Sequence, residues 1–305
     1  MSAFDSQFGV GQGVSSKVVG RKGFDWGRLI RYCLLIFFVA VVLMPVYVLV
    51  VTSFKGVGDA DPSRAWALPQ VWTLDSWKAA FQGLGGIQPV GPALARTALM
   101  VIPAAIISSL LGSANGFVLS RWSFPGANIV FAFILFGMFI PYQAVMVPLY
   151  GLVNDLNWLV PKGIPVLIML HVIYGIPITT LIFRNYYQSV PQELIEASRV
   201  DGGGMLRTYF SVVLPISMPS FVVVLIWQFT SAWNDFLFAR FFGGNMQTQA
   251  PVTVVLQNMA VGGTSGSVWG ATMAATILSS LPTLIVYILL GKYFIGGLMS
   301  GSVKG

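Results

Sequence analysis

The sequence predicts an all-α polytopic membrane protein with six transmembrane helices. Of its 305 residues, 56% are hydrophobic and only 9% are charged, whereas soluble chains average roughly 25% charged residues. Six stretches of the chain are mostly apolar over about 20 residues, the length that a helix needs to cross a bilayer. The second half also contains one long polar interruption, residues 191–219, where we expect the protein to meet a soluble partner.

Six spans are predicted. In chain order they are Tyr32–Val51, Thr97–Leu119, Ile129–Tyr150, Pro165–Phe183, Phe221–Phe241 and Trp269–Leu290. Several contain proline, which bends a helix and is tolerated where neighbours satisfy the freed carbonyl groups. In the second span, Gly112 and Gly116 form a GxxxG pair that lets another helix approach closely. The predicted division is therefore an N-terminal tail, residues 1–31, a six-helix domain, residues 32–294, and a C-terminal tail, residues 295–305.

Lysine and arginine predict the orientation, because they are enriched in cytoplasmic loops. With the N-terminus inside, eleven of the 17 basic residues lie in cytoplasmic segments: Lys17, Arg21, Lys22, Arg28, Arg31, Arg121, Arg184, Arg199, Arg207, Lys292 and Lys304. The remaining six lie outside: Lys55, Arg64, Lys78, Arg96, Lys162 and Arg240. Both termini and the 191–219 segment are thus expected in the cytoplasm.

Several function classes are excluded by composition. A single cysteine, Cys33, allows no intrachain disulfide, and neither it nor the lone His171 makes a multi-residue metal site, so no metal is expected. The sequence has no G-x-x-x-x-G-K-[ST] loop to cradle nucleotide phosphates. Its basic residues are explained by membrane topology rather than by nucleic-acid binding.

The outer loop between the first two spans contains Trp66, Trp72 and Trp77. These side chains suit either a belt at the membrane surface, which we favour, or a surface that touches an extracytoplasmic partner.

The 191–219 segment has a local pattern of its own. Ser189 and Gln192 have the spacing of a capping box, which predicts a short helix from there. The glycines at positions 202–204 should end that helix, because glycine allows positive φ. A second short helix, Met205–Val213, should then lead to Pro215 before the next span.

The motif Glu196-Ala197-Ser198, with Gly202 after three residues and Val212-Val213-Leu214-Pro215 further on, resembles the EAA loop of the permease subunits of ATP-binding-cassette (ABC) importers. Serine stands for the usual second alanine and valine for isoleucine. The resemblance implies a cytoplasmic coupling helix that docks into a groove on a separate ATPase subunit. The coupling residues that it implies are Glu196, Ala197, Ser198, Asp201, Gly202, Leu214 and Pro215.

The fifth predicted span, FVVVLIWQFTSAWNDFLFAR, carries a polar stripe. As a continuous helix it would place Gln228, Ser231 and Asp235 on one face, with Asn234 beside them. Polar groups inside a membrane usually face the bundle interior or a water-filled cavity, so these four residues are candidates to line a solute path. The alternatives are hydrogen bonds between helices and, for Asp235, a pair with Arg240.

Two further residues, Tyr142 and Gln143, should lie at a similar depth and face the same cavity. Amide, hydroxyl and indole groups suit a neutral polyhydroxylated ligand. His171 in the fourth span is expected to be a packed, hydrogen-bonded residue rather than a proton carrier.

Three features together narrow the resemblance: Trp233-Asn234-Asp235, the EAA-like loop, and the ending from Gly297 to Gly305. They look like a carbohydrate-uptake permease, the shorter subunit of the maltose-type heterodimer, from about the first span to the last residue. The context of Gln228 and of Gly291-Lys292-Tyr293-Phe294 looks most like glucose/mannose-type members.

This resemblance implies a type I ABC importer permease core in a bacterial or archaeal cytoplasmic membrane. It implies as partners a second permease, two ATPase subunits that bind ATP and Mg, and an extracytoplasmic sugar-binding protein. The chain itself would have no catalytic residue and no cofactor. The tail residues that would contact the ATPase are Ser302, Val303, Lys304 and Gly305.

Two other classes stay open from the sequence. An ion- or proton-driven secondary carrier would need intramembrane charge or an inverted pair of broken spans, and Asp235 is the one convincing intramembrane acid. A membrane scaffold would leave the polar stripe and the EAA-like loop without a purpose.

Overall fold

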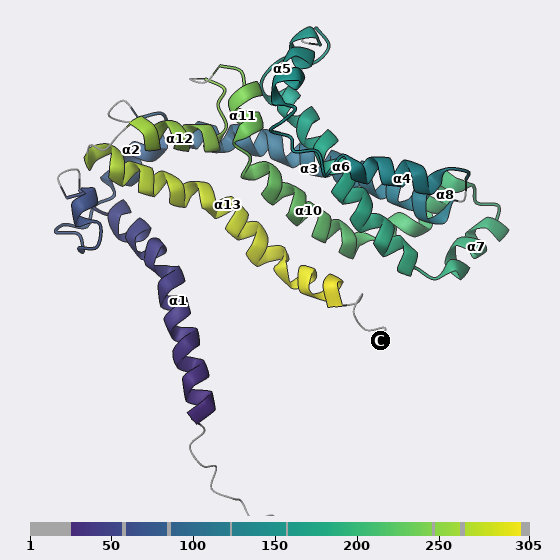
Figure 1. The fold of residues 1–305 in the computed structure, drawn as a ribbon, viewed down its shortest axis with the longest axis horizontal. Helices are drawn as coiled ribbons and strands as arrows, with labels where there is room; N and C mark the ends of the chain where they lie inside the picture. The colour runs from purple at the N-terminus through teal and green to yellow at the C-terminus, as the bar shows by residue number, and fades with distance from the viewer. Residues whose placement is uncertain are drawn as a thin grey trace, which may run out of the picture. The chain divides into compact units, whose positions relative to one another are not determined.

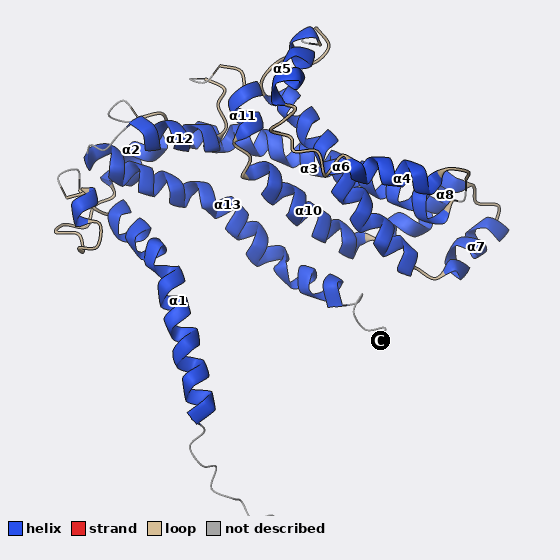
Figure 2. Cartoon of the chain, in the orientation of Figure 1, coloured by secondary structure: helices blue, strands red, loops and turns tan. Residues whose placement is uncertain are grey.

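The computed structural model of the protein describes residues 26–56, 59–83, 87–122, 124–156, 158–245, 248–262 and 266–299. Helices dominate these ranges (Figures 1 and 2), and the β pairing within them is an isolated bridge between Lys55 and Trp72. The chain divides into two compact units, residues 1–46 and residues 47–305. The prediction of an all-α protein is confirmed.

Four helices in the described ranges are long and apolar enough to cross a membrane: α1 (Trp26–Ser53), α3 (Val90–Arg121), α6 (Ile164–Ser189) and α13 (Gly266–Met299) over Val268–Gly291. They correspond to the first, second, fourth and sixth predicted spans. α1 belongs to the first unit up to Val46 and begins at Trp26, within the segment predicted as the N-terminal tail.

The third predicted span, Ile129–Tyr150, is wrong as a continuous helix. It consists of α4 (Ala127–Phe136) and α5 (Met146–Asp155), with turns between them. Gly137 and Pro141 lie in this gap. Glycine weakens a helix, and proline removes a backbone donor and clashes with the preceding turn, so the apolar run is long enough for one helix but does not form one.

The fifth predicted span, Phe221–Phe241, is also interrupted. α10 (Met218–Trp233) ends before the aspartate, and the short α11 (Leu237–Phe242) follows. Asp235 lies two residues before α11, and its carboxylate accepts hydrogen bonds from the backbone N–H groups of Phe238, at 3.4 Å, and Ala239, at 3.1 Å. Acidic side chains are favourable near a helix N-terminus, so the residue predicted inside a helix instead lies between two helices and binds the first backbone N–H groups of the second.

α3 and α6 pack against each other very closely. A Cβ atom added to Gly112 would lie 2.2 Å from the Thr179 hydroxyl oxygen, and one added to Gly116 would lie 2.8 Å from the Cβ of Phe183. The Thr179 hydroxyl donates to the carbonyl oxygen of Ser108 across the interface, at 3.1 Å. The GxxxG pair therefore packs two helices together, as expected.

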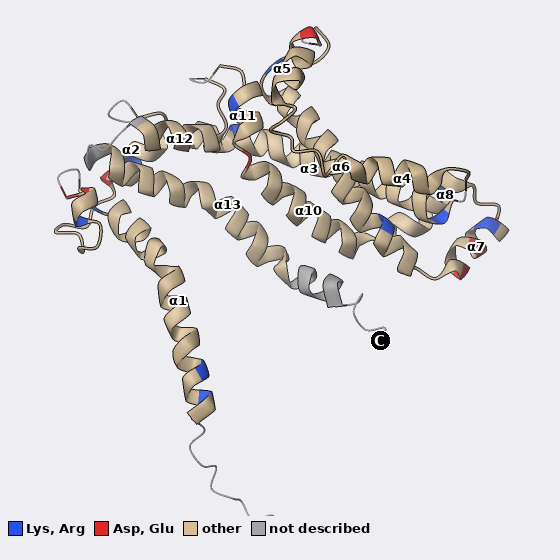
Figure 3. Ribbon diagram, viewed as in Figure 1, with Lys and Arg blue, Asp and Glu red and all other residues tan. Residues whose placement is uncertain are grey.

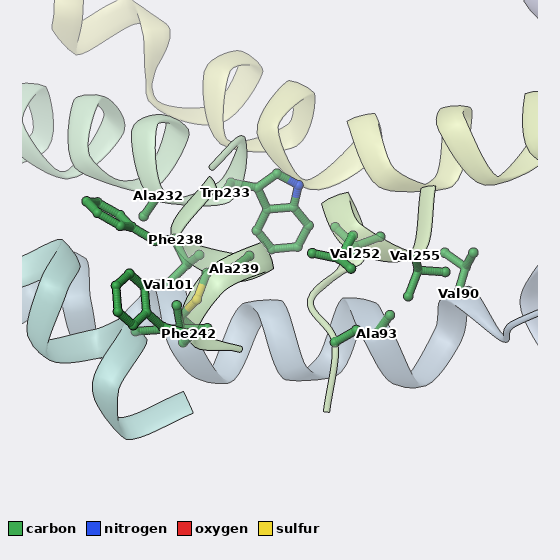
Figure 4. Close-up of a cluster of buried hydrophobic side chains, with 14 of the residues drawn as sticks. Val90, Ala93, Val101, Ala232, Trp233, Phe238, Ala239, Phe242, Val252 and Val255 are labelled. Atoms are coloured by element: carbon green, nitrogen blue, oxygen red, sulfur yellow. The ribbon is translucent and has the colours of Figure 1, made fainter. Parts of the chain in front are cut away.

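Two apolar clusters stabilise the second unit. The larger one joins α3, α6, α10, α11, α13 and α12 (Val252–Gly262). Figure 4 shows part of it, with Trp233 between side chains of α3, α11 and α12. The indole N–H of Trp233 also donates to the carbonyl oxygen of Ser279 in α13, at 2.9 Å. The smaller cluster lies where α3 and α6 meet the 191–219 segment and contains Phe117, Phe183, Ile195 and Tyr209.

The loop after α1 contains short helices in its described part. It includes the one-turn helix η1 (Pro62–Arg64) and α2 (Asp75–Gln82). Lys55 is buried and donates to the carbonyl oxygen of Arg64, at 2.6 Å, and this burial lowers the pKa of its ammonium group. Of the loop tryptophans, Trp66 and Trp72 are exposed while Trp77 is partly buried, so the belt interpretation stays a prediction for the first two.

Candidate functional site

The 191–219 segment begins with α7 (Gln192–Val200), the short helix that the sequence predicts. The predicted capping box is wrong. Ser189 still belongs to α6 and donates to the carbonyl oxygen of Tyr186, at 2.7 Å, and α7 starts after Pro191 with no side-chain cap. The Gln192 side chain instead accepts a hydrogen bond from Arg121 of α3, at 2.8 Å.

Glycine ends α7, as expected. Gly202 has φ +74°, in the left-handed region that favours glycine. The N–H of Gly203 donates back to the carbonyl oxygen of Ser198, at 2.8 Å, which satisfies a carbonyl group near the helix end. A Cβ added to Gly202 would meet no atom within 4 Å, so the surface at this turn is open.

α7 has one anchored side and one free side. Ile195 is buried in the smaller apolar cluster, whereas Glu196, Ala197 and Asp201 are exposed. Ser198 turns inward, and its hydroxyl oxygen lies 2.9 Å from that of Thr208 in α8. The predicted coupling residues Glu196, Ala197, Asp201 and Gly202 are thus available to a partner, whereas Ser198 holds α7 to α8 within the segment.

The second half of the segment is helical but irregular. α8 (Met205–Thr208) continues as the π-helix η3 (Tyr209–Val213) and as α9 (Leu214–Ile216). The pair Met205–Ile216 and Met218–Trp233 is bent by 77°. The prediction of one short helix ending before Pro215 is therefore wrong in detail, because Pro215 lies inside α9 and the bend comes at Ser217. Leu214 is partly buried and Pro215 exposed.

Figure 3 shows how charge is distributed around this segment. α10 carries no charged residue, while α7 carries both acidic and basic residues and α8 carries Arg207. A polar, bent and exposed segment between apolar helices fits contact with a soluble partner.

The polar residues predicted to line a path fall into two groups. Gln228 is buried and donates to the carbonyl oxygen of His171 in α6, at 2.9 Å. The side chain of Asp235 is 9% exposed, and its carboxylate lies 3.7 Å from the His171 imidazole. Ser231 and Asn234, by contrast, are exposed. The predicted common face of Gln228, Ser231 and Asp235 is therefore wrong, because the helix ends at Trp233, before Asp235.

The same buried group gathers aromatic rings from separate segments. Tyr142 is partly buried, and its ring centroid lies 5.3 Å from that of Phe238, which also contacts the His171 ring at 5.6 Å. Gln143 next to it is exposed. His171 is packed as expected, although its Nε2 has no hydrogen-bond partner. Asp235 faces this histidine, and its predicted alternative pair with Arg240 does not form among the described residues.

Sequence reasoning missed the residues that fasten the 191–219 segment to the long helices. Arg121 contacts the junction of α6 and α7, and the Ser113 hydroxyl oxygen lies 2.6 Å from that of Tyr187 and 2.9 Å from that of Tyr209. A basic residue in the last turn of a helix was the only available signal for Arg121. The tail residues 302–305 lie outside the described residues.

Long apolar helices joined by an exposed, bent polar segment define an integral membrane protein that is built to meet a soluble partner. Over residues 104–295 the chain matches the family described as the inner membrane component of binding-protein-dependent transport systems. The chain belongs to this family. It is therefore a permease component of an ABC importer, and membership counts against both the secondary-carrier and the scaffold alternatives.

Several named proteins are similar along most of their length. The xylose/arabinose import permease protein XacI of Haloferax volcanii is 35% identical over 89% of this chain and 92% of its own. The melibiose/raffinose/stachyose import permease protein MelC of Bacillus subtilis is 30% identical over 86% of this chain and 91% of its own.

A solved structure supports the fold. A bacterial ABC transporter involved in the import of the acidic polysaccharide alginate matches with a TM-score of 0.73 and 20% identity, over 88% of this chain and 96% of that chain. The predicted type I permease fold is confirmed.

Proposed function

We propose that this protein is the permease subunit of an ABC sugar importer. It forms half of the transmembrane path and couples ATP hydrolysis on a separate subunit to uptake. The observation that supports the coupling role is the helix α7 together with the turn at Gly202 that ends it. One side is anchored through Ile195, and the other exposes Glu196, Ala197 and Asp201.

The partners in this proposal are a second permease, two ATPase subunits and an extracytoplasmic sugar-binding protein. ATP and Mg are held by the ATPase subunits, and this chain contributes no catalytic group. Closure of the ATPase pair moves the docked α7, and the membrane path changes its access. Such a shift requires ATP and the loaded binding protein to prefer different states of the path.

Sugar as the cargo is supported by the names of the similar permeases, which cover pentoses and galactosides. Glucose or mannose stays our narrower prediction. The test is uptake of a panel of labelled sugars by a strain that lacks this gene, with and without the gene restored. Uptake of pentoses alone would contradict the narrower prediction and leave the sugar class intact.

The exposure of the predicted path residues divides them into candidates for solute contact and residues that hold the fold. The exposed polar side chains of Ser231, Asn234 and Gln143 are the best candidates to touch solute, while Gln228, Asp235 and Tyr142 are held in the buried group around His171.

For the C-terminal tail, contact of residues 302–305 with the ATPase is proposed from the family resemblance. Deleting these residues should lower uptake while the chain still inserts.

Replacing Gly202 tests the coupling proposal. Gly202→Trp adds bulk to an open surface, and we expect it to abolish uptake or to release the ATPase from the purified complex. Gly202→Asn is the matched control for the backbone, because asparagine tolerates the left-handed region far better than other residues with a side chain. Wild-type uptake and ATPase activity in Gly202→Trp would contradict the assignment.

A further inference from the structure

Arg121, the last residue of α3, holds the junction between α6 and α7. Its Nε donates to the carbonyl oxygen of Tyr187, at 2.8 Å, and its Nη2 contacts the carbonyl oxygens of Tyr187 and Val190. Its Nη1 donates to the side chain of Gln192, at 2.8 Å. The last carbonyl groups of a helix lack intrahelical partners and favour a cation. One guanidinium thus joins the end of α6 to the start of α7.

A second arginine, Arg199 of α7, reaches back to the end of α3. The Arg199 guanidinium, from the last turn of α7, lies 4.6 Å from the ring centroid of Trp122, directly after α3. Its Nη2 also lies 3.4 Å from the carbonyl oxygen of Arg121. Both ends of α7 are therefore fastened to the end of α3. We call Arg121, Trp122, Gln192 and Arg199 the α3–α7 clasp.

Outside the clasp, α7 is held by the burial of Ile195 in the smaller apolar cluster and by the contact of Ser198 with Thr208 in α8. Within α7, Ile195 is the only fully buried residue. Two residues, Val190 and Pro191, connect α7 to α6. By contrast, α3 is packed against α6 through Gly112 and Gly116 with no room for a methyl group. The clasp therefore gives a displacement of α7 a direct polar route to α3, which is rigidly packed against α6.

We propose that the α3–α7 clasp transmits the movement of the docked α7 to α3, with Arg121 and Arg199 as positioning residues. This inference rests on the proposed function, because it takes α7 to be the element that the ATPase moves. Lysine cannot replace Arg121, since a single ammonium group on a flexible stem cannot engage the carbonyl groups of α6 and the Gln192 amide in a planar fork.

The experiment uses the complex that copurifies with the tagged full chain. Two quantities are measured, the uptake of labelled sugar by cells and the ATPase activity of the purified complex. Their ratio is the uptake supported per unit of ATPase activity. We expect Arg121→Lys to lower this ratio at least about fivefold, the lower end of typical coupling between sites, while the ATPase still copurifies. Arg31→Lys, the same substitution on the exposed surface of α1, is the matched control and should leave the ratio unchanged.

A rescue variant separates coupling from general damage. In Arg121→Lys with Gln192→Glu, the new carboxylate can pair with the lysine, and we expect the ratio to recover by at least about twofold, corresponding to a weak ion pair. If Arg121→Lys fails to assemble, Gln192→Ala and Arg199→Lys each remove one arm of the clasp and should lower the ratio on their own. Wild-type ratios in the assembled variants would overturn the inference. If no ATPase copurifies with the wild-type chain, the proposed function itself is overturned.

Discussion

Two regions of the second unit are built in different ways from apolar sequence. α3 and α6 are long uninterrupted helices in close contact at Gly112 and Gly116. α10 and α11 follow an equally apolar stretch, but the chain leaves the helix after Trp233 and restarts at Leu237. The first region is a packed frame, and the second contains a joint.

The difference lies in which groups the polar and small residues meet. In the frame, glycine and threonine lie between two helices and bring the backbones together. In the joint, the Asp235 carboxylate takes the N–H groups of the next helix, and its side chain lies against His171 of the frame. We infer that helix breaks provide places where a membrane protein can bend, while small-residue contacts define the parts that move as one.

The largest effect is expected from breaking the frame. Gly112→Leu forces a side chain into the space of Thr179, and overpacking of this kind costs about 3 kcal/mol. We expect a large fall in folded yield and in the thermal stability of the detergent-solubilised protein. Gly151→Leu is the matched control, because Gly151 is an exposed glycine in α5 with no atom near an added Cβ. Equal stability of the two variants would contradict the close contact.

A smaller effect is expected at the joint. Asp235→Ala removes the acceptor for the α11 backbone N–H groups and should cost about 1 kcal/mol, the usual value when a side-chain acceptor for the first N–H groups of a helix is lost. Asp235→Asn keeps an acceptor oxygen and should cost less. Hydrogen exchange should rise at the amides of residues 237–242 in the alanine variant and stay near wild type in the asparagine variant. Exchange that rises equally in both would mean that the charge near His171, rather than the cap, holds the joint.

The smallest effect on stability is expected at the exposed residues beside the joint. Ser231→Ala and Asn234→Ala should each change the free energy of unfolding by less than about 0.5 kcal/mol, because both side chains are exposed. If they touch the solute, sugar uptake should fall although the amount of protein in the membrane does not. Unchanged uptake would remove them from the path and leave the coupling proposal standing.

Much of the architecture could be predicted from local sequence. Apolar length predicted α1, α3, α6 and α13 as spans, and the glycines after Val200 predicted the end of α7. These features depend on a residue's own backbone preference or on its transfer into lipid, which neighbours in space change little.

The breaks could not be predicted in the same way. Residues 129–150 and 221–241 are apolar enough for continuous helices, yet each forms two. A proline or an aspartate inside such a run is compatible with a bent helix or with a broken one. The choice depends on whether other elements satisfy the freed backbone groups, as Thr253 does by donating to the carbonyl oxygen of Asp235 at 2.7 Å.

The sequence alone determined the membrane class, most of the spans and the EAA-like loop, because hydrophobic length and glycine geometry are properties of short segments. Only the tertiary structure decided which polar residues are exposed and which hold the fold together. It brought Arg121 to Gln192 and Gln228 to His171, pairs separated by 71 and 57 positions. Such contacts depend on how whole helices pack, and that information is distributed over the chain rather than written at either residue.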